Sequence, residues 1–111
     1  MSIQNWSKDM IVVNLPPSSQ DHRELETAIA MAREKGDFNL VVDFSSVDVV
    51  GSRMFAALLE LRQLLQESGH KLVLCGLSPA TKGVFSIARL DDVFEFVQDR
   101  FAALADHQIV A

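Results

Sequence analysis

The sequence contains a single cysteine, five scattered glycines and no long apolar run. The one cysteine, Cys75, can form neither an internal disulfide nor a multi-cysteine zinc site, and its apolar surroundings predict a buried, inert thiol. The longest unbroken apolar run, residues 54–59, is far shorter than the roughly 20 residues needed to cross a bilayer. The glycines at 36, 51, 69, 76 and 83 form no phosphate-binding loop.

Basic residues are also few. Ten Lys and Arg stand against 15 Asp and Glu, which gives a formal charge of −5 and argues against DNA or RNA as the main ligand. The sequence does not begin with basic residues followed by an apolar stretch, so it predicts no secretory signal. We therefore expect a cytoplasmic protein without membrane insertion. A length of 111 residues, 49% of them hydrophobic, predicts one domain spanning residues 1–111.

Apolar periodicity predicts strands that alternate with helices. Two short apolar stretches predict an N-terminal hairpin with a turn at Lys8-Asp9, and Pro16-Pro17 ends its second strand. The order β-β-α-β-α-β-α-β-α predicts an α/β fold with a small mixed, largely parallel sheet and right-handed crossovers. The predicted strands are residues 3–6, 10–15, 40–42, 72–75 and 93–97, and the predicted helices begin near residues 21, 52, 79 and 101.

Three of these helices have a predicted buried face. Spacings of three and four residues predict that the first helix, which Asp21 and Glu24 would cap, buries one stripe and ends at Gly36. The second, residues 52–67, has a strongly apolar side, and Ser78-Pro79 is a typical start for the third. The predicted inward residues are Leu25, Ala28, Ile29 and Ala32, then Met54, Leu58, Leu61 and Leu65, then Val84, Phe85 and Ala88.

Catalytic constellations are not apparent. His22, His70 and His107 lack metal-ligand spacing, and no metal-ligating or cofactor-binding residue is predicted. Ser52 and His70 stand at opposite ends of one predicted helix, about 25 Å apart at 1.5 Å per residue, so they cannot share a catalytic triad. The aspartates Asp43, Asp48, Asp91 and Asp92 are predicted to form turns and caps. We therefore expect a protein that is not an enzyme.

The strongest local feature is the turn at Gly51-Ser52-Arg53, between a buried strand and a long amphipathic helix. One interpretation is structural: Gly51 permits the turn, and Ser52 caps the helix by accepting a bond from a free backbone N–H. The other is functional: the positive end of the helix dipole would tolerate a phosphate on Ser52, which would change what can dock there.

Residues 43–59, Asp-Phe-Ser-Ser-Val-Asp-Val-Val-Gly-Ser-Arg-Met-Phe-Ala-Ala-Leu-Leu, resemble the central motif of STAS domains, the anti-sigma-factor antagonist family. That motif reads approximately Asp-Leu-Ser-x-Val-x-x-Ile-Asp-Ser-(Ser/Thr)-Gly-Leu-x-x-Leu. Residues 69–79, Gly-His-Lys-Leu-Val-Leu-Cys-Gly-Leu-Ser-Pro, and the apolar positions that follow resemble the family's second half. The resemblance covers residues 38–97 and implies a STAS, SpoIIAA-like fold.

The resemblance also implies a function. Family members are typically non-enzymatic proteins of bacterial partner switches that bind an anti-sigma factor with serine kinase activity. Phosphorylation of the first serine in the motif, which falls on Ser52 here, releases them. The resemblance thus implies that Ser52 is the phosphoacceptor and that Gly51, Ser52, Arg53 and Met54 belong to the partner interface. No cofactor is implied.

The chain departs from the family motif around this serine. Gly51 replaces an aspartate, Arg53 replaces the second Ser/Thr, and Met54 replaces a glycine. Leu15-Pro-Pro-Ser-Ser also stands where the family has Gly-Glu-(Ile/Leu)-Asp. Two alternative hypotheses therefore remain: an adaptor or scaffold subunit of a signalling complex without phosphorylation, and a module that senses nucleotides or lipids.

Overall fold

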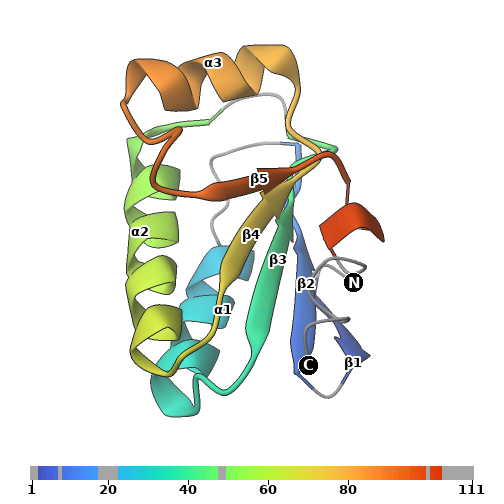
Figure 1. Cartoon of the computed structure of the whole chain (residues 1–111), viewed down its shortest axis with the longest axis vertical. Coiled ribbons are helices and arrows are strands. Elements are labelled where there is room, and N and C mark those ends of the chain that lie inside the picture. Colours follow the sequence, from blue (N-terminus) through green and yellow to red (C-terminus); the bar gives the residue numbers. More distant parts are fainter. Residues whose placement is uncertain (1–2, 8, 18–22, 48–49, 100, 104–111) are drawn as a thin grey trace.

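The computed structural model describes residues 3–7, 9–17, 23–47, 50–99 and 101–103 (Figure 1). Its elements follow the predicted order, and residues 101–103 form a helical turn at the predicted position of the last helix. Lys8, Asp21 and Asp48, which were assigned to a turn, a cap and a loop, lie outside the described residues. The elements are β1 Ile3–Ser7, β2 Met10–Asn14, α1 Arg23–Glu34, β3 Asn39–Asp43, α2 Ser52–Glu67, β4 Leu72–Cys75, α3 Pro79–Ile87 and β5 Glu95–Val97.

The five strands form one sheet in the sequential order β1-β2-β3-β4-β5. The β1–β2 pair is antiparallel and the other three pairs are parallel, which confirms the predicted mixed α/β fold. When every right-handed crossover steps in the same direction along a sheet, the crossover helices fall on one face. α1 and α2 accordingly pack side by side against one face, while α3 lies across the end of the sheet (Figure 1).

The three central strands, β2, β3 and β4, are buried on both faces. Alternate residues of β2, β3 and β4 point toward α1 and α2 and join the larger core, where α2 contributes the predicted stripe Met54, Leu58, Leu61 and Leu65. The opposite face forms a smaller cluster that Ala103 joins from the last helical turn. Cys75 lies fully buried in this second cluster, which confirms its predicted burial. Burial on both faces explains why these strands read as continuous apolar runs.

α3 is oriented by Phe85 and differs from the prediction. Phe85 is fully buried and contacts four other phenylalanine rings edge-on, with centroid separations of 4.8–6.0 Å. The predictions that Val84 and Ala88 point inward are wrong, because both are exposed and Thr81 takes the second buried position. The four partner rings are Phe44, Phe55, Phe94 and Phe96.

β5 also begins later than predicted. Residues 91–93 form a turn in which the Val93 N–H donates to the Leu90 carbonyl at 3.1 Å, so the strand starts at Glu95 and not at Val93. Asp91 and Asp92 lie in this turn, as expected for turn-forming aspartates. The apolar side chains of Val93 and Phe94 nevertheless pack against the main core. Apolar character alone therefore did not distinguish strand from turn here.

A buried carboxylate fixes the carboxyl end of β3. Asp43 Oδ1 accepts hydrogen bonds from the Ser45 N–H at 2.8 Å and from the Ser45 hydroxyl. Gly76, which follows β4, approaches this pair so closely that a Cβ at Gly76 would lie 2.6 Å from Ser45 Oγ and 2.8 Å from Asp43 Oδ1. Its φ of +71° is also a conformation that side chains disfavour, so this position requires glycine.

Two glycine-to-alanine variants test this constraint. We expect Gly76→Ala to lower the free energy of unfolding by about 2–4 kcal/mol, because it combines left-handed strain with overpacking. Gly83→Ala is the matched control: Gly83 lies in α3 with open space around its Cβ position, so alanine should stabilise the protein by about 0.5–1 kcal/mol. Urea denaturation of both variants measures the difference. Equal stabilities would contradict the assignment.

Candidate functional site

The turn before α2 places Gly51, and not Ser52, at the N-cap. Gly51 has extended backbone angles of φ −140° and ψ 177°, and its carbonyl accepts the first helical hydrogen bond, from the Phe55 N–H at 3.2 Å. Ser52 is the first helical residue. The interpretation of Ser52 as the helix cap is therefore wrong, because a residue with helical backbone angles cannot turn its side chain back onto its own first turn in that way.

Ser52 and Arg53 are both exposed, whereas Met54 is only 2% exposed and packs into the main core. Across the described part of the chain, the Ser52 hydroxyl forms no hydrogen bond and no side chain caps α2. The structure thus presents an accessible hydroxyl beside the free N–H groups of a 16-residue helix. Met54 anchors this turn to the core and exposes little surface that a partner could contact.

Gly51 is not required by the backbone. Its φ of −140° is accessible to every residue, and a Cβ at this position would meet no atom within 4 Å. Gly51 is compatible with the turn, as the sequence interpretation had it, but the turn does not require glycine. An aspartate, which the family motif has here, would fit without strain. Glycine in place of aspartate therefore removes a side chain that could cap the helix, while the backbone conformation accommodates either residue.

Residues 44–47, which follow β3 on the way to this turn, are held at several points. The Asp43–Ser45 bonds fix its start, the Val47 N–H donates to the Phe44 carbonyl at 2.9 Å, and Val47 is buried. Phe55, one turn into α2, packs on Phe85 with ring centroids 4.8 Å apart. Residues on both sides of the Ser52 turn are therefore held in place by contacts with the rest of the fold.

A shallow hollow of about 280 Å³ lies between α1 and α2 next to this turn. Arg53 lines it from the first turn of α2, and Ala56 and Ala57 also line it. Glu26 and Glu60 border the hollow, but neither forms an ion pair with Arg53 among the described residues, and Glu60 pairs with Arg33 instead. Arg53 thus adds an accessible cation one residue after Ser52.

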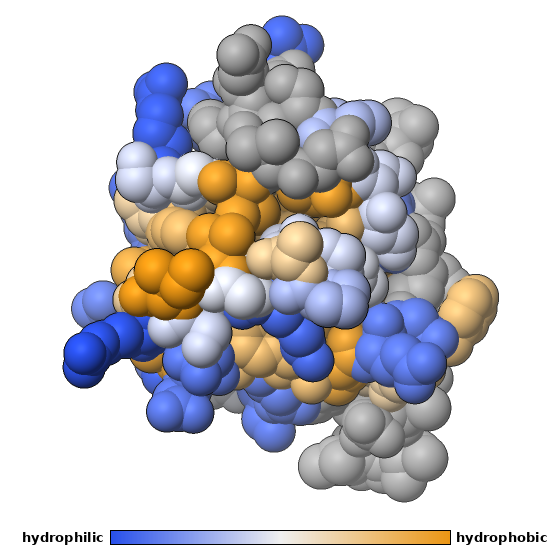
Figure 2. Space-filling view, turned by 90° about the horizontal axis from the view of Figure 1, so that it is seen from above, coloured by the Kyte–Doolittle hydropathy of each residue, from blue (hydrophilic) through white to orange (hydrophobic). Residues whose placement is uncertain are grey.

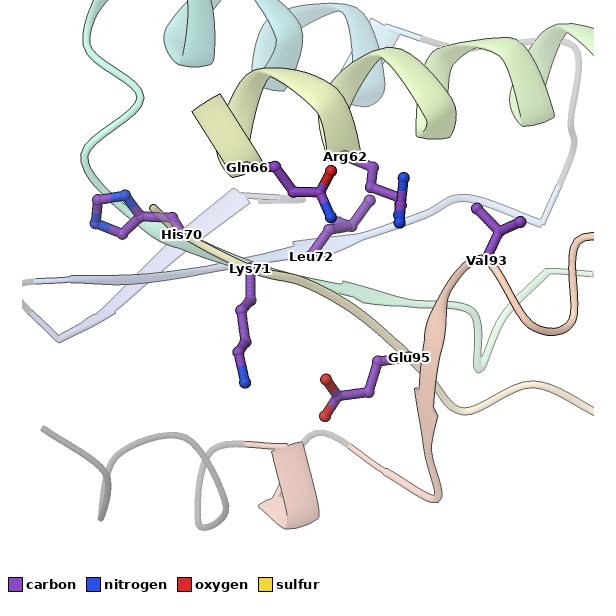
Figure 3. A pocket seen from close by; sticks show the side chains of 7 residues that line it. All are labelled: Arg62, Gln66, His70, Lys71, Leu72, Val93 and Glu95. Atoms are coloured by element: carbon purple, nitrogen blue, oxygen red, sulfur yellow. The ribbon is translucent and has the colours of Figure 1, made fainter. Parts of the chain in front are cut away.

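A second hollow, of about 190 Å³, lies near the opposite end of α2 (Figure 3). Arg62 and Gln66 reach from α2 toward Leu72, whereas the side chains of Lys71 and Glu95 lie on the other side of the strand and that of His70 points outward (Figure 3). These groups do not converge on one point. The hollow therefore lacks the arrangement that would hold a ligand, and it is remote from Ser52.

Within the residues that the structure describes, no three His, Cys, Asp or Glu side chains group together as metal ligands would. None of the helices in this part of the chain has both the length and the apolar character needed to cross a membrane.

Two substitutions at Gly51 test the cap assignment. Gly51→Asp should be more stable than Gly51→Ala by about 1 kcal/mol, because an aspartate side chain at the N-cap accepts from the free N–H groups of α2 and alanine cannot. Both variants should retain the native far-UV circular dichroism spectrum, since the site is open to a Cβ. Thermal and urea unfolding provide the measurement, and an aspartate variant no more stable than the alanine variant would place the cap elsewhere.

Solved structures with related folds match the chain along nearly its whole length. An anti-sigma-factor antagonist (STAS) domain protein from Planctomyces limnophilus superimposes with a TM-score of 0.79 at 18% identity over 94% of each chain. The anti-sigma factor antagonist SpoIIAA in its unphosphorylated form gives a TM-score of 0.76 at 17% identity over 98% of this chain and 97% of that one. At these identities the likeness concerns the fold.

Sequence similarity extends this result beyond the fold. BtrV of Bordetella bronchiseptica, assigned as an anti-sigma factor antagonist, is 34% identical over 88 residues, which are 79% of this chain and 76% of that protein. The family model for the STAS domain matches residues 10–104. This match spans β2 to β5 with α1, α2 and α3 and includes the Gly51-Ser52-Arg53 turn. The chain belongs to the STAS domain family.

Proposed function

We propose that this protein is an anti-sigma factor antagonist that binds an anti-sigma factor through the Ser52 turn and is released when that partner phosphorylates Ser52. The observation that carries this proposal is the exposed Ser52 hydroxyl at the uncapped start of α2. Membership of the STAS family and similarity to proteins assigned as anti-sigma factor antagonists support it. Proteins of this kind are generally non-enzymatic, and the chain would act as the kinase's substrate.

The proposed modification is chemically simple at this position. Ser52 Oγ would attack the γ-phosphorus of ATP held by the kinase, form the O–P bond, and release ADP as the bond to the bridging oxygen breaks. The hydroxyl proton would pass to a base of the kinase. The product carries a charge of about −2 beside the positive end of a helix dipole, which tolerates an anion, so α2 should remain folded.

Release from the partner would then follow because a phosphate at the contact must be desolvated. In the unmodified protein the turn can pack against a partner and leave only a neutral hydroxyl to be satisfied. A phosphate in the same contact would have to lose its water or meet negative groups of the partner, and either effect weakens binding. Arg53 is close enough in sequence to neutralise part of that charge in the free protein, which would favour the released state. The switch would operate in the cytoplasm, where ATP is available.

Substitutions at Ser52 test this function. Binding to the purified anti-sigma factor of the same organism should weaken by about tenfold or more in Ser52→Asp, which adds charge at the contact, and by less than about threefold in Ser52→Ala. Gln66→Glu is the matched control, because it adds one negative charge to an exposed position at the far end of α2. Isothermal titration calorimetry measures each dissociation constant.

Incubation with ATP and the same anti-sigma factor, followed by mass spectrometry, should locate one phosphate on Ser52. Binding by Ser52→Asp as tight as that of the wild type, together with an unmodified Ser52, would contradict the switch and favour an adaptor without a covalent signal. Failure of the wild-type protein to bind any anti-sigma factor of its organism would contradict the function itself.

A further inference from the structure

The hollow between α1 and α2 lies beside the proposed contact at Ser52. Ala56, which lines it, comes four residues after Ser52, so the two residues lie on the same side of α2, one turn apart. Arg53, the next residue after Ser52, lines the hollow as well. A partner that covers Ser52 therefore meets this hollow. We call it the α1–α2 hollow, and its lining residues are Glu26, Ile29, Arg53, Ala56, Ala57 and Glu60.

Small side chains on α2 leave this space open. The hollow measures about 280 Å³, and α2 contributes the short side chains of Ala56 and Ala57 where it packs beside α1. Further from Ser52 the two helices are joined by the ion pair of Arg33 and Glu60. Because Glu60 also lines the hollow, this pair bounds it at the end away from Ser52.

Two exposed charges of opposite sign lie at the hollow, one on each helix. Arg53 comes from α2 and Glu26 from α1, and within the described residues neither forms an ion pair. The other charge in the lining, on Glu60, is already met by Arg33. The apolar side chains of Ile29 and the two alanines complete the lining. The hollow therefore offers a positive group on its α2 side, a negative group on its α1 side and apolar surface with them.

The exposed apolar side chains of α3 show no comparable pattern. Figure 2 looks down on the end of the molecule that α3 covers and shows apolar side chains gathered there, and Ile87 is 86% exposed. Lys82, the only charged residue of α3, stands five positions before Ile87 and therefore on another side of the helix. The α3 surface thus gives no indication of a partner's chemistry, whereas the α1–α2 hollow does.

We infer that the α1–α2 hollow receives one aliphatic side chain of the anti-sigma factor, flanked by an acidic group that meets Arg53 and a basic group that meets Glu26. An aliphatic anchor matches the apolar part of the lining, and such anchors in pockets contribute much of the affinity of protein interfaces. The two opposite charges fix the orientation in which the partner docks. This inference rests on the proposed function and deepens it, because it names a second contact and the chemistry of the group that fills it.

Arg53 links this contact to the proposed switch. A phosphate on Ser52 would carry a charge of about −2 one residue from the Arg53 guanidinium and would compete with the partner's acidic group for it. Phosphorylation would then weaken the contact at the hollow as well as the contact at the turn. The effects of charge at Ser52 and of the Arg53 side chain on binding should therefore be coupled.

Two other occupants fit the hollow less well. In a symmetric pair of copies the two hollows would face each other, and neither copy would supply a side chain to fill the other's space. A small ligand would remain largely in solvent in a shallow hollow, whereas binding sites for small molecules usually enclose most of the ligand's surface.

Filling the hollow from within tests the inference. Ala57→Leu should weaken binding to the purified anti-sigma factor of the same organism by about tenfold, because the new side chain occupies the space of the partner's anchor. Ala30→Leu is the matched control, since Ala30 is exposed on α1 and does not line the hollow; it should change binding by less than about twofold. Isothermal titration calorimetry measures both, after circular dichroism has confirmed that each variant is folded.

Charge reversals test the two rim contacts without filling the hollow. Arg53→Glu and Glu26→Lys should each weaken binding by about fivefold or more. Their matched controls are Lys35→Glu and Glu34→Lys, the same reversals at exposed residues at the far end of α1, and each should change binding by less than about twofold. Rim variants that bind no more weakly than their controls would overturn the inference.

A double-mutant cycle tests the coupling to Ser52. In the Arg53→Gln background, Ser52→Asp should weaken binding by about threefold, instead of about tenfold in the wild-type background, because the guanidinium for which the two acidic groups compete is gone. Effects of the two substitutions that simply add would overturn the inference.

The outcomes separate this inference from the proposed function. Binding by Ala57→Leu as tight as by Ala30→Leu overturns the inference and leaves the proposed function intact, whereas a wild-type protein that binds no anti-sigma factor of its organism overturns both. Dimerisation in sedimentation velocity that Ala57→Leu abolishes would overturn the inference in favour of a second copy. A small molecule that copurifies with the wild type in native mass spectrometry, and is lost in Ala57→Leu, would overturn it in favour of a ligand.

Discussion

The ring of Phe85 joins α3 to the end of β3, to the first turn of α2 and to β5. It is fully buried and meets Phe44 after β3, Phe55 in α2, and Phe94 and Phe96 around β5, always edge-on, which is a favoured geometry for aromatic pairs. α3 has nine residues and could not persist alone in water, so this contact both orders the helix and sets its rotation. The rotation in turn decides which α3 residues face solvent. The exposure of Val84 and Ile87 is therefore a consequence of where Phe85 packs.

The first turn of α2 is anchored in the core, but no described side chain caps its N-terminal N–H groups. Met54 and Phe55 anchor the first turn in the core, and the Asp43–Ser45–Gly76 contact fixes the loop behind it. Ser52 lies on this support with an exposed hydroxyl, next to N–H groups that no described side chain caps. Such an end tolerates added negative charge without loss of structure, so a phosphate there could change binding while the fold is kept. The same property would let Gly51 be replaced by the aspartate of the family motif.

The proposed partner surface lies at the start of α2. This part of α2 supplies the exposed Ser52 hydroxyl and the exposed cation of Arg53. An interface of this kind obtains affinity from a few apolar contacts and partner choice from charge. It would also respond to a phosphate at one edge without any movement of the backbone.

Much of the fold and the place of the site follow from the sequence alone. Residue periodicity predicts the order of elements, the bounds of α2 and its buried stripe, because these depend on contacts between residues three or four apart. The motif around residues 43–59 indicates the family and singles out Ser52. The tertiary structure decided the rest: that Gly51 is the N-cap, that Gly76 and not Gly51 requires glycine, and that Val84 and Ala88 face solvent. These features depend on backbone angles and on partners distant in sequence, above all Phe85 with its aromatic neighbours and Gly76 with Asp43, which no local pattern encodes.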